Sequence, residues 1–232
     1  MLALVLDTSS AAVTAGLVEF PGHAGSSGQT QPAVLAERVT VDARAHAELL
    51  TPSIQACLVE AGVRIAELSA VVAGLGPGPF TGLRVGLMTA AALADATGLP
   101  SYGVCSLDAI AAAHPEQGGL LVAGDARRKE VYWARYRNGR RVAEPAVTKP
   151  AELIPELPGE LGGTAVMAGA GARLYAGVLG LPLLDADYPT VAGLAACAAE
   201  RVLSRAPGEV LVPLYLRRPD AVEPAARKPV MR

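Results

Sequence analysis

Asp7, Thr8 and Ser9 are the residues near the start of the chain whose types best suit chemistry, and they directly follow an apolar stretch at residues 2–6. A carboxylate and two hydroxyls at the end of a strand can hold a metal–phosphate complex. The same hydroxyls can instead satisfy the amides of a turn. The sequence leaves both interpretations of this triplet open.

A glycine-rich stretch, AGLGPGPFTGLR at residues 73–84, offers a second candidate site. A phosphate-binding Walker loop needs a lysine after its last glycine, but no lysine precedes Lys129, and a dinucleotide-binding loop needs a glycine where Pro79 stands. Gly76 and Gly78 could still bind an anion at the start of the following helix. The prolines favour a rigid elbow between strand and helix, so these glycines and the Asp7 triplet predict at most a vestigial nucleotide site.

Metal and nucleophile chemistry has little support in the sequence. The three histidines and three cysteines are widely spaced, and His46 is followed by Leu50 where a second helical metal ligand would stand. There is no G-x-S-x-G nucleophile motif. We therefore expect no metal or other cofactor, and the odd number of cysteines favours reduced thiols in a cytoplasmic protein.

Basic residues gather in residues 125–141, which contain seven Lys and Arg together with two Tyr and one Trp. The chain as a whole has a net charge of −2. Interleaved basic and aromatic residues are typical of a nucleic-acid groove, which makes Arg127, Arg128, Arg135 and Arg137 candidate RNA contacts. A half-buried hairpin explains the stretch equally well, because alternate residues of a strand point to opposite faces.

The elements that must position these residues alternate between strands and helices. The hydrophobic pattern predicts strands at 2–6, 12–19, 33–41, 69–76, 119–123, 130–137 and 164–168, a short final strand at 212–218, and helices at 44–61, 81–97 and 190–204. A strand and a short helix are expected within 99–113, and residues 142–163 carry no clear pattern.

The predicted helix at 81–97 is apolar on nearly every side, so it must be buried on nearly every side. Gly82, Gly86, Ala90 and Ala94 recur every four residues and form a ridge that lets another backbone approach closely. One side of this helix can lie on the sheet, and the other needs the preceding helix or another protein. A mean hydropathy of +0.34 also suggests apolar surface reserved for a partner.

No stretch of the sequence predicts a membrane span. The most helix-like apolar run covers only residues 85–94, and a bilayer needs about 20 residues. The apolar N-terminal stretch lacks a basic region and ends at Asp7, which favours a buried strand over a signal peptide.

Several segments together resemble the conserved blocks of the bacterial TsaB family, also called YeaZ. These are LVLDTSSAAVTAGL, RAHAELLTPSIQACL, GLGPGPFTGLRVGLMTAAALA, LPSYGVCSLDAIA, DARRKEVYWA and VPLYLR. The resemblance is close over residues 1–137. It implies a two-lobed α/β fold of the actin-like and Hsp70-like class (ASKHA, ribonuclease H-like), with mixed sheets and a reduced second lobe. The expected division is residues 1–105, residues 106–216 with a last helix that can pack back on the first lobe, and a disordered tail at 217–232.

The resemblance also implies a subunit without catalysis. The family is similar to TsaD, the transferase that places a threonylcarbamoyl group on adenosine 37 of tRNAs reading ANN codons. TsaD-like proteins carry a metal-binding His-x-x-x-His after a strand that ends in Gly-Val, and here Ser106 and Ile110 stand at the corresponding positions. Neither side chain can replace an imidazole, so the resemblance implies a pseudo-enzyme.

TsaB-like proteins are known as scaffolds that pair with TsaD through two helices and recruit the ATPase TsaE. The helices correspond to residues 44–61 and 81–97, and the same face is expected to form a homodimer when the chain is alone. The expected partner-binding residues are His46, Leu49, Ile54, Leu83, Arg84, Leu87, Met88 and Ala91. The resemblance implies contact with tRNA only through the complex, and any nucleotide would lie at the partner interface.

Two alternatives stay open. Asp7 and the glycine-rich stretch are compatible with a metal- or nucleotide-dependent enzyme, either a glycoprotease or a phosphotransferase. The basic residues between Arg127 and Arg141 are compatible with an independent RNA-binding module, whose affinity would fall with added salt.

Overall fold

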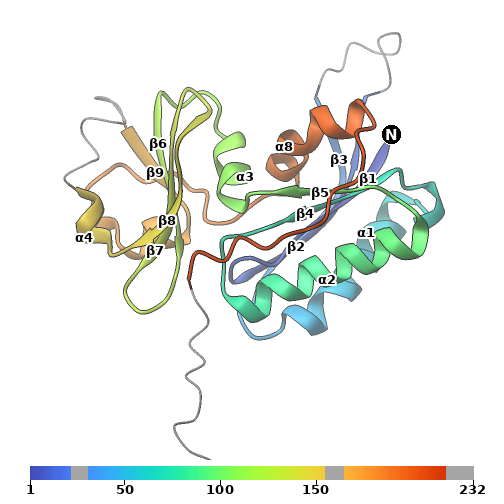
Figure 1. Ribbon diagram of the computed structural model, residues 1–232, viewed down its shortest axis with the longest axis horizontal. Coiled ribbons are helices and arrows are strands. Elements are labelled where there is room, and N and C mark those ends of the chain that lie inside the picture. The colour runs from blue at the N-terminus through green and yellow to red at the C-terminus, as the bar shows by residue number, and fades with distance from the viewer. Residues whose placement is uncertain (22–30, 155–164, 218–232) are drawn as a thin grey trace, which may run out of the picture.

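The computed structural model describes residues 1–21, 31–154 and 165–217, which form two lobes (Figure 1). Of the tail predicted at residues 217–232, only residue 217 lies within the described part of the chain. The first lobe contains β1 (Leu2–Asp7), β2 (Ala12–Glu19), β3 (Ala33–Val41), α1 (His46–Ala61), the short 3-10 helix η1 (Ile65–Glu67), β4 (Ala70–Gly74), α2 (Phe80–Thr97) and β5 (Ser101–Val104). Its strands form one mixed sheet in the order β3-β2-β1-β4-β5, in which β4 and β5 run parallel to β1.

Helices cover both faces of the first sheet. Leu4 and Leu6 of β1 pack in the core beneath α1 and α2, whereas Ala3 and Val5 pack against α8 (Val191–Leu203) on the opposite face. This two-sided burial follows from the alternation of side chains along a strand, and it explains why β1 and β4 read as continuous apolar runs. α8 lies far along the chain, yet it completes the first lobe.

The second lobe contains β6 (Gly119–Asp125), β7 (Val131–Arg137), β8 (Arg140–Thr148), α4 (Pro150–Leu153), β9 (Ala165–Ala168), α6 (Ala170–Leu174) and α7 (Ala176–Leu179). Its sheet has the order β8-β7-β6-β9, with β9 parallel to β6. Both lobes therefore begin in the same way. Three strands pair through two antiparallel hairpins, and the fourth strand lies parallel to the first, on its other side. The second lobe has one strand fewer.

The short helix α3 (Ser106–Ala112) lies between the lobes. Leu107 and Ile110 pack against β6 and β7, and α3 also has extensive contacts with α8. The Tyr136 hydroxyl donates to the Asp108 carboxylate at 2.7 Å, which ties α3 to β7. α3 thus joins the second sheet to the first lobe.

The elements differ from the sequence pattern in two places. The unassigned stretch at 142–163 contributes most of β8 and the helix α4. The predicted final strand at 212–218 is not a strand in its described part: residues 206–217 run in an extended path along the first lobe with only scattered backbone hydrogen bonds, among them Leu214 N–H to Leu75 O at 2.8 Å. We call residues 206–217 the C-terminal strap.

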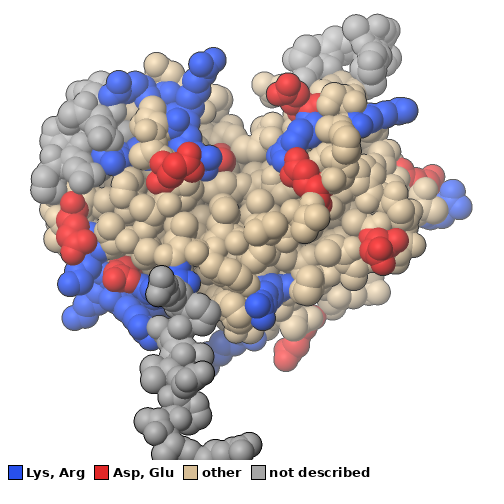
Figure 2. Space-filling view, viewed as in Figure 1, with Lys and Arg blue, Asp and Glu red and all other residues tan. Residues whose placement is uncertain are grey.

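Charged side chains are unevenly distributed over the face shown in Figure 2, where Lys and Arg gather at the upper and lower ends of the second lobe. Between these groups most of the visible surface is uncharged. None of the helices in the described part of the chain is both long and apolar enough to cross a membrane.

Candidate functional site

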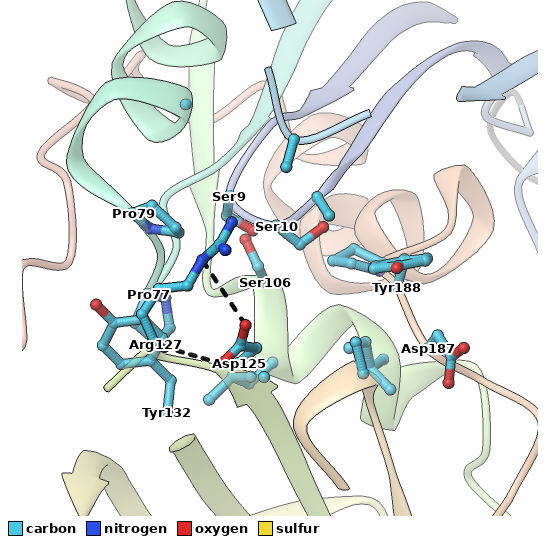
Figure 3. Close-up of a pocket in the computed structure, with 18 of the residues that line it drawn as sticks. Ser9, Ser10, Pro77, Pro79, Ser106, Asp125, Arg127, Tyr132, Asp187 and Tyr188 are labelled. Atoms are coloured by element: carbon cyan, nitrogen blue, oxygen red, sulfur yellow. Dashed lines mark hydrogen bonds and ion pairs between the residues drawn. The ribbon is translucent and has the colours of Figure 1, made fainter. Parts of the chain in front are cut away.

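A cleft with a cavity of about 390 Å³ lies where the two lobes meet (Figure 3). Its first-lobe wall comes from the end of β1 and the start of α2, its floor from α3, and its second-lobe wall from the end of β6 and the segment before α8. The lining side chains used below are Ser9, Ser10, His46, Pro77, Pro79, Phe80, Ser106, Ile110, Asp125, Arg127, Tyr132, Asp187 and Tyr188.

Asp7 stands at the carboxyl end of β1 but does not line the cleft, because its carboxylate is enclosed. One oxygen accepts from the backbone N–H and the hydroxyl of Ser9, at 2.9 and 2.8 Å, and the other accepts from the Ser106 hydroxyl at 2.5 Å. Burial raises the pKa of Asp7 above its usual value, and these hydrogen bonds only partly oppose that shift. The carboxylate therefore links β1 to α3 and faces no ligand.

The Thr8 hydroxyl likewise bonds only to groups of the chain itself. Its hydroxyl donates to the carbonyl of Gly82 at 2.7 Å and accepts from the N–H of Gly86 at 2.8 Å. These are the two backbone groups that an ideal α-helix joins directly, so the hydroxyl is inserted into one turn of α2. A Cβ atom on Gly86 would lie 2.5 Å from the Thr8 hydroxyl oxygen, which explains why this contact needs glycine.

The glycine-rich loop between β4 and α2 packs against the same strand end. A Cβ on Gly78 would lie 1.9 Å from the Ser9 carbonyl oxygen, and one on Gly74 would lie 1.7 Å from the Asp7 carboxylate. Gly76 and Gly78 are buried and do not line the cleft, whereas Pro77 and Pro79 do. This geometry favours the rigid elbow over a phosphate cradle. Of the five residues predicted for a vestigial nucleotide site, only Ser9 reaches the cleft.

The second-lobe wall repeats part of this arrangement. Asp125 ends β6 as Asp7 ends β1, and it accepts from the Arg127 N–H at 2.8 Å just as Asp7 accepts from Ser9 two residues later. The Arg127 side chain lies 3.7 Å from the same carboxylate, as the dashed lines in Figure 3 show. Unlike Asp7, Asp125 lines the cleft.

Several polar groups of the cleft already have partners within the chain. Asp187 binds the Arg173 guanidinium at 2.7 Å, and a ring nitrogen of His46 lies 2.7 Å from the Ser10 carbonyl oxygen. The Ser106 hydroxyl, besides donating to Asp7, accepts from the Gly76 N–H at 3.2 Å. Within the residues that the structure describes, no group of three His, Cys, Asp or Glu side chains is placed to hold a metal ion. What the cleft offers a ligand is mainly apolar and aromatic surface.

The structure divides the eight predicted partner-binding residues. Arg84 and Met88 are exposed and Leu49 and Ala91 are half-buried, but the other four lie in the interior of the chain: His46, Ile54, Leu83 and Leu87. The ridge of Gly82, Gly86, Ala90 and Ala94 is buried as well. It faces its own lobe, where Gly82 and Gly86 pack on Thr8. The segment that the ridge admits closely is therefore β1 of its own lobe, and the ridge is not exposed to a partner in this structure.

The predicted RNA contacts are also divided. Arg127, Arg128 and Arg137 are exposed. Arg135 is only 5% exposed, and its guanidinium lies over the Trp133 ring at 4.7 Å from the centroid. β7 lies inside the second sheet with both faces covered, so Arg135 cannot serve as a surface contact in this structure.

Sequence reasoning did not identify Asp125, Asp187, Tyr132 and Tyr188 as residues of the cleft. Asp125 carries a usable signal, because it repeats the pattern of an aspartate at the end of a strand that opens a hairpin. The others reach the cleft only through the packing of the lobes, which no local pattern reports.

Two lobes with the same strand order around a cleft define an α/β protein of the actin-like, ribonuclease H-like class, as the resemblance implied. Residues 33–169 match the family model described as TsaD, tRNA N6-adenosine threonylcarbamoyltransferase. The solved structure of YeaZ from Pseudomonas aeruginosa is similar with a TM-score of 0.75 and 29% identity, over 93% of this chain and 99% of that one.

The chain belongs to the TsaB/YeaZ family. It is 38% identical to the tRNA threonylcarbamoyladenosine biosynthesis protein TsaB of Escherichia coli, over 57% of this chain and 60% of that protein. It is 52% identical to an uncharacterized protein of Mycobacterium leprae, over 95% of this chain and 56% of that protein. Each of these two alignments covers little more than half the length of the relative.

Proposed function

We propose that this chain is a subunit without catalysis of its own in the synthesis of threonylcarbamoyladenosine in tRNA. The supporting observation is the interior of the cleft. By the resemblance, Ser106 and Ile110 stand where the transferase would carry its metal-binding histidines. Both line the cleft, and the Ser106 hydroxyl is bound to Asp7 and to the Gly76 amide. The acid at the end of β1 is thereby sealed from any substrate. We expect no cofactor in the chain itself, and any nucleotide would be held at the interface with a partner.

The proposed partner is a TsaD-like transferase that binds the outer side of α1 and α2. This side exposes apolar side chains that the fold does not cover, among them Val59 at 82% and Met88 at 63% exposure. Arg84, one turn before Met88 on α2, is exposed as well. When the chain is alone we expect the same side to form a homodimer, and we expect the complex to recruit a TsaE-like ATPase and to contact tRNA.

The test is to deplete the protein, measure threonylcarbamoyladenosine in tRNA, and restore it with variants. A charge on the outer side of α2, Met88→Asp, should abolish co-purification with the TsaD-like protein and leave the nucleoside depleted. Val142→Asp in β8, which is 47% exposed, is the control for adding a charge to exposed apolar surface. Full modification and undiminished co-purification by Met88→Asp would contradict the docking surface.

The enzyme alternative makes the opposite prediction for the isolated chain. A phosphotransferase or glycoprotease should bind a nucleotide or a divalent metal in the cleft, which calorimetry with magnesium–ATP and with zinc would detect. Tight binding that is lost in Ser106→Leu but kept in Val142→Asp would favour that alternative. We expect no measurable heat from either ligand.

A further inference from the structure

We propose that the C-terminal strap, residues 206–217, is a clasp that fixes the second lobe against the first and so sets the width of the cleft. The strap follows α8, runs along the first lobe and ends at the second (Figure 1). Three sets of its contacts support this role, and they involve β5, the start of α2 and the turn after β6.

The first set anchors the strap to the free edge of the first sheet. Glu209 N–H donates to the Ser101 carbonyl at 2.8 Å, and the Ser101 hydroxyl donates to the Glu209 carbonyl at 2.8 Å. The Glu209 carboxylate binds the Arg201 guanidinium of α8 at 2.8 Å and accepts from the Gly103 N–H at 3.2 Å. These bonds join the strap, β5 and α8 within one lobe.

The second set lies at the first-lobe wall of the cleft. The Tyr215 ring stacks on Phe80 with centroids 5.1 Å apart, and its hydroxyl accepts from Arg84 Nε at 2.9 Å. The Arg84 guanidinium in turn lies 3.8 Å above the Phe80 ring. Because Phe80 lines the cleft, the strap is fixed to one wall of the cavity.

The third set reaches the opposite wall. Arg217 donates to the Ala126 carbonyl at 2.8 Å and forms an ion pair with Glu130, so it holds both ends of the turn between β6 and β7. The residues between them, Arg127, Arg128 and Lys129, have φ angles of 62, 54 and 62°. Residues other than glycine rarely adopt this left-handed backbone conformation unless surrounding contacts impose it. Arg217 supplies such contacts, and they tie the turn that carries Arg127 to the first lobe.

These contacts make the strap a further connection between the lobes, besides α3 and the segment that leads from the second lobe to α8. Because α3 packs against α8, those two connections lie side by side and would leave the lobes free to rotate about them, as hinged domains do. The strap makes its contacts at a different place and restricts that rotation. Loss of the Arg217 contacts should therefore loosen the turn after β6 and widen the range of distances between the lobes, without unfolding either lobe.

The test combines hydrogen exchange with distance measurements on the full chain. Arg217→Ala should accelerate amide exchange in peptides spanning residues 126–131 about fivefold, the effect expected when one hydrogen bond is lost. Glu130→Gln should give a similar effect, and the double variant should add little to either single change. The control is Arg64→Ala, which breaks an exposed ion pair with Glu67 inside the first lobe.

Spin labels at Asp95→Cys in α2 and Arg140→Cys in β8, in a Cys197→Ala background, report the distance between the lobes. Dilution with unlabelled chain keeps each measured pair within one molecule. We expect one narrow distance distribution in the parent and a broader one in Arg217→Ala. The double variant Arg217→Glu with Glu130→Arg, which exchanges the two charges, should partly restore the narrow distribution. An unchanged distribution in Arg217→Ala, or unchanged exchange at 126–131, would overturn the proposal.

Discussion

Asp7 shows how a residue that looks chemical can be purely structural. Its position at a strand end and its hydroxyl neighbours match a phosphate site, yet Ser9 and Ser106 occupy both carboxylate oxygens. Such a buried acid is held at a cost in desolvation, which is the main cause of its raised pKa. Its value to the protein is that it joins β1 to α3.

This burial predicts a specific pH dependence for Asp7→Asn. Since the folded-state pKa lies above the unfolded value, near 3.8, the contribution of Asp7 to the free energy of unfolding is greatest below pH 3.8 and declines as pH rises through the folded-state pKa. The parent should therefore lose stability relative to Asp7→Asn as pH rises from 4 to 7. Urea unfolding of both proteins measures this difference, and Asp95→Asn controls for removing an exposed carboxylate. A difference that grows in favour of the parent would contradict the prediction.

At this scale the sequence could predict only half of the site. The strand that ends at Asp7 is visible in the apolar pattern. One of the two readings of the triplet has its hydroxyls satisfy backbone amides, which Thr8 does for Gly86 and Ser9 does not. The bond between Asp7 and Ser106 joins residues 99 positions apart, so nothing local reports it. The same holds for Arg135, whose charge favours an exposed position but which lies in β7, where both faces are covered.

Among the elements, α2 is the one whose packing most constrains the site. Thr8 is inserted against its first turns, and glycine at 82 and 86 provides the space. The four-residue spacing of small residues was a correct signal of close packing. It could not indicate the direction of that packing, because a helix that is apolar on most sides has several faces to choose from.

Gly86→Ala tests this close packing. The new Cβ would lie 2.5 Å from the Thr8 hydroxyl oxygen, so the helix or the strand must move. We expect the free energy of unfolding to fall by about 1–3 kcal/mol, the usual effect of overpacking, and the better helix propensity of alanine offsets only part of this. Chemical denaturation measures it.

Gly177→Ala is the matched control, because Gly177 lies in α7 and a Cβ there would meet nothing within 4 Å. It should leave stability unchanged or raise it by about 1 kcal/mol through helix propensity. Equal effects of the two substitutions would show that Gly86 is not constrained by Thr8.

The errors among the elements have physical causes. β8 is mostly exposed or half-buried and carries a proline, so it lacks the apolar alternation that identifies strands. The strap has the apolar residues of a strand, but its hydrogen bonds to the first sheet are too few to make a regular ladder. Strand propensity alone could not show that β8 is a strand and that the strap is not.

For the whole molecule, the fold class followed from the resemblance of several short blocks and is confirmed by the YeaZ structure. The repeated strand order was harder to predict, because the two lobes share topology and strand-end aspartates without an evident repeat in sequence. The return of α8 and the strap to the first lobe depends on contacts between distant segments, which a sequence pattern does not contain.

That return predicts different effects for two truncations. Ending the chain after residue 205 removes the strap, which exposes the edge of β5 and the side of α8 that binds Glu209. It should lower the free energy of unfolding far more than ending the chain after residue 217. Thermal or urea unfolding of the two truncated proteins beside the full chain measures this. Equal stabilities for the two would show that the strap contributes nothing to the first lobe.

The chain order of the lobes also determines when each can fold during synthesis. The second sheet is built from a continuous span, residues 119–168, and can close as soon as that span has left the ribosome. The first sheet is made earlier, but Ala3, Val5 and Val72 stay uncovered until α8 emerges about 120 residues after β4. A nascent chain therefore carries an exposed apolar sheet until α8 emerges, which makes this lobe a part of the protein that needs chaperone protection.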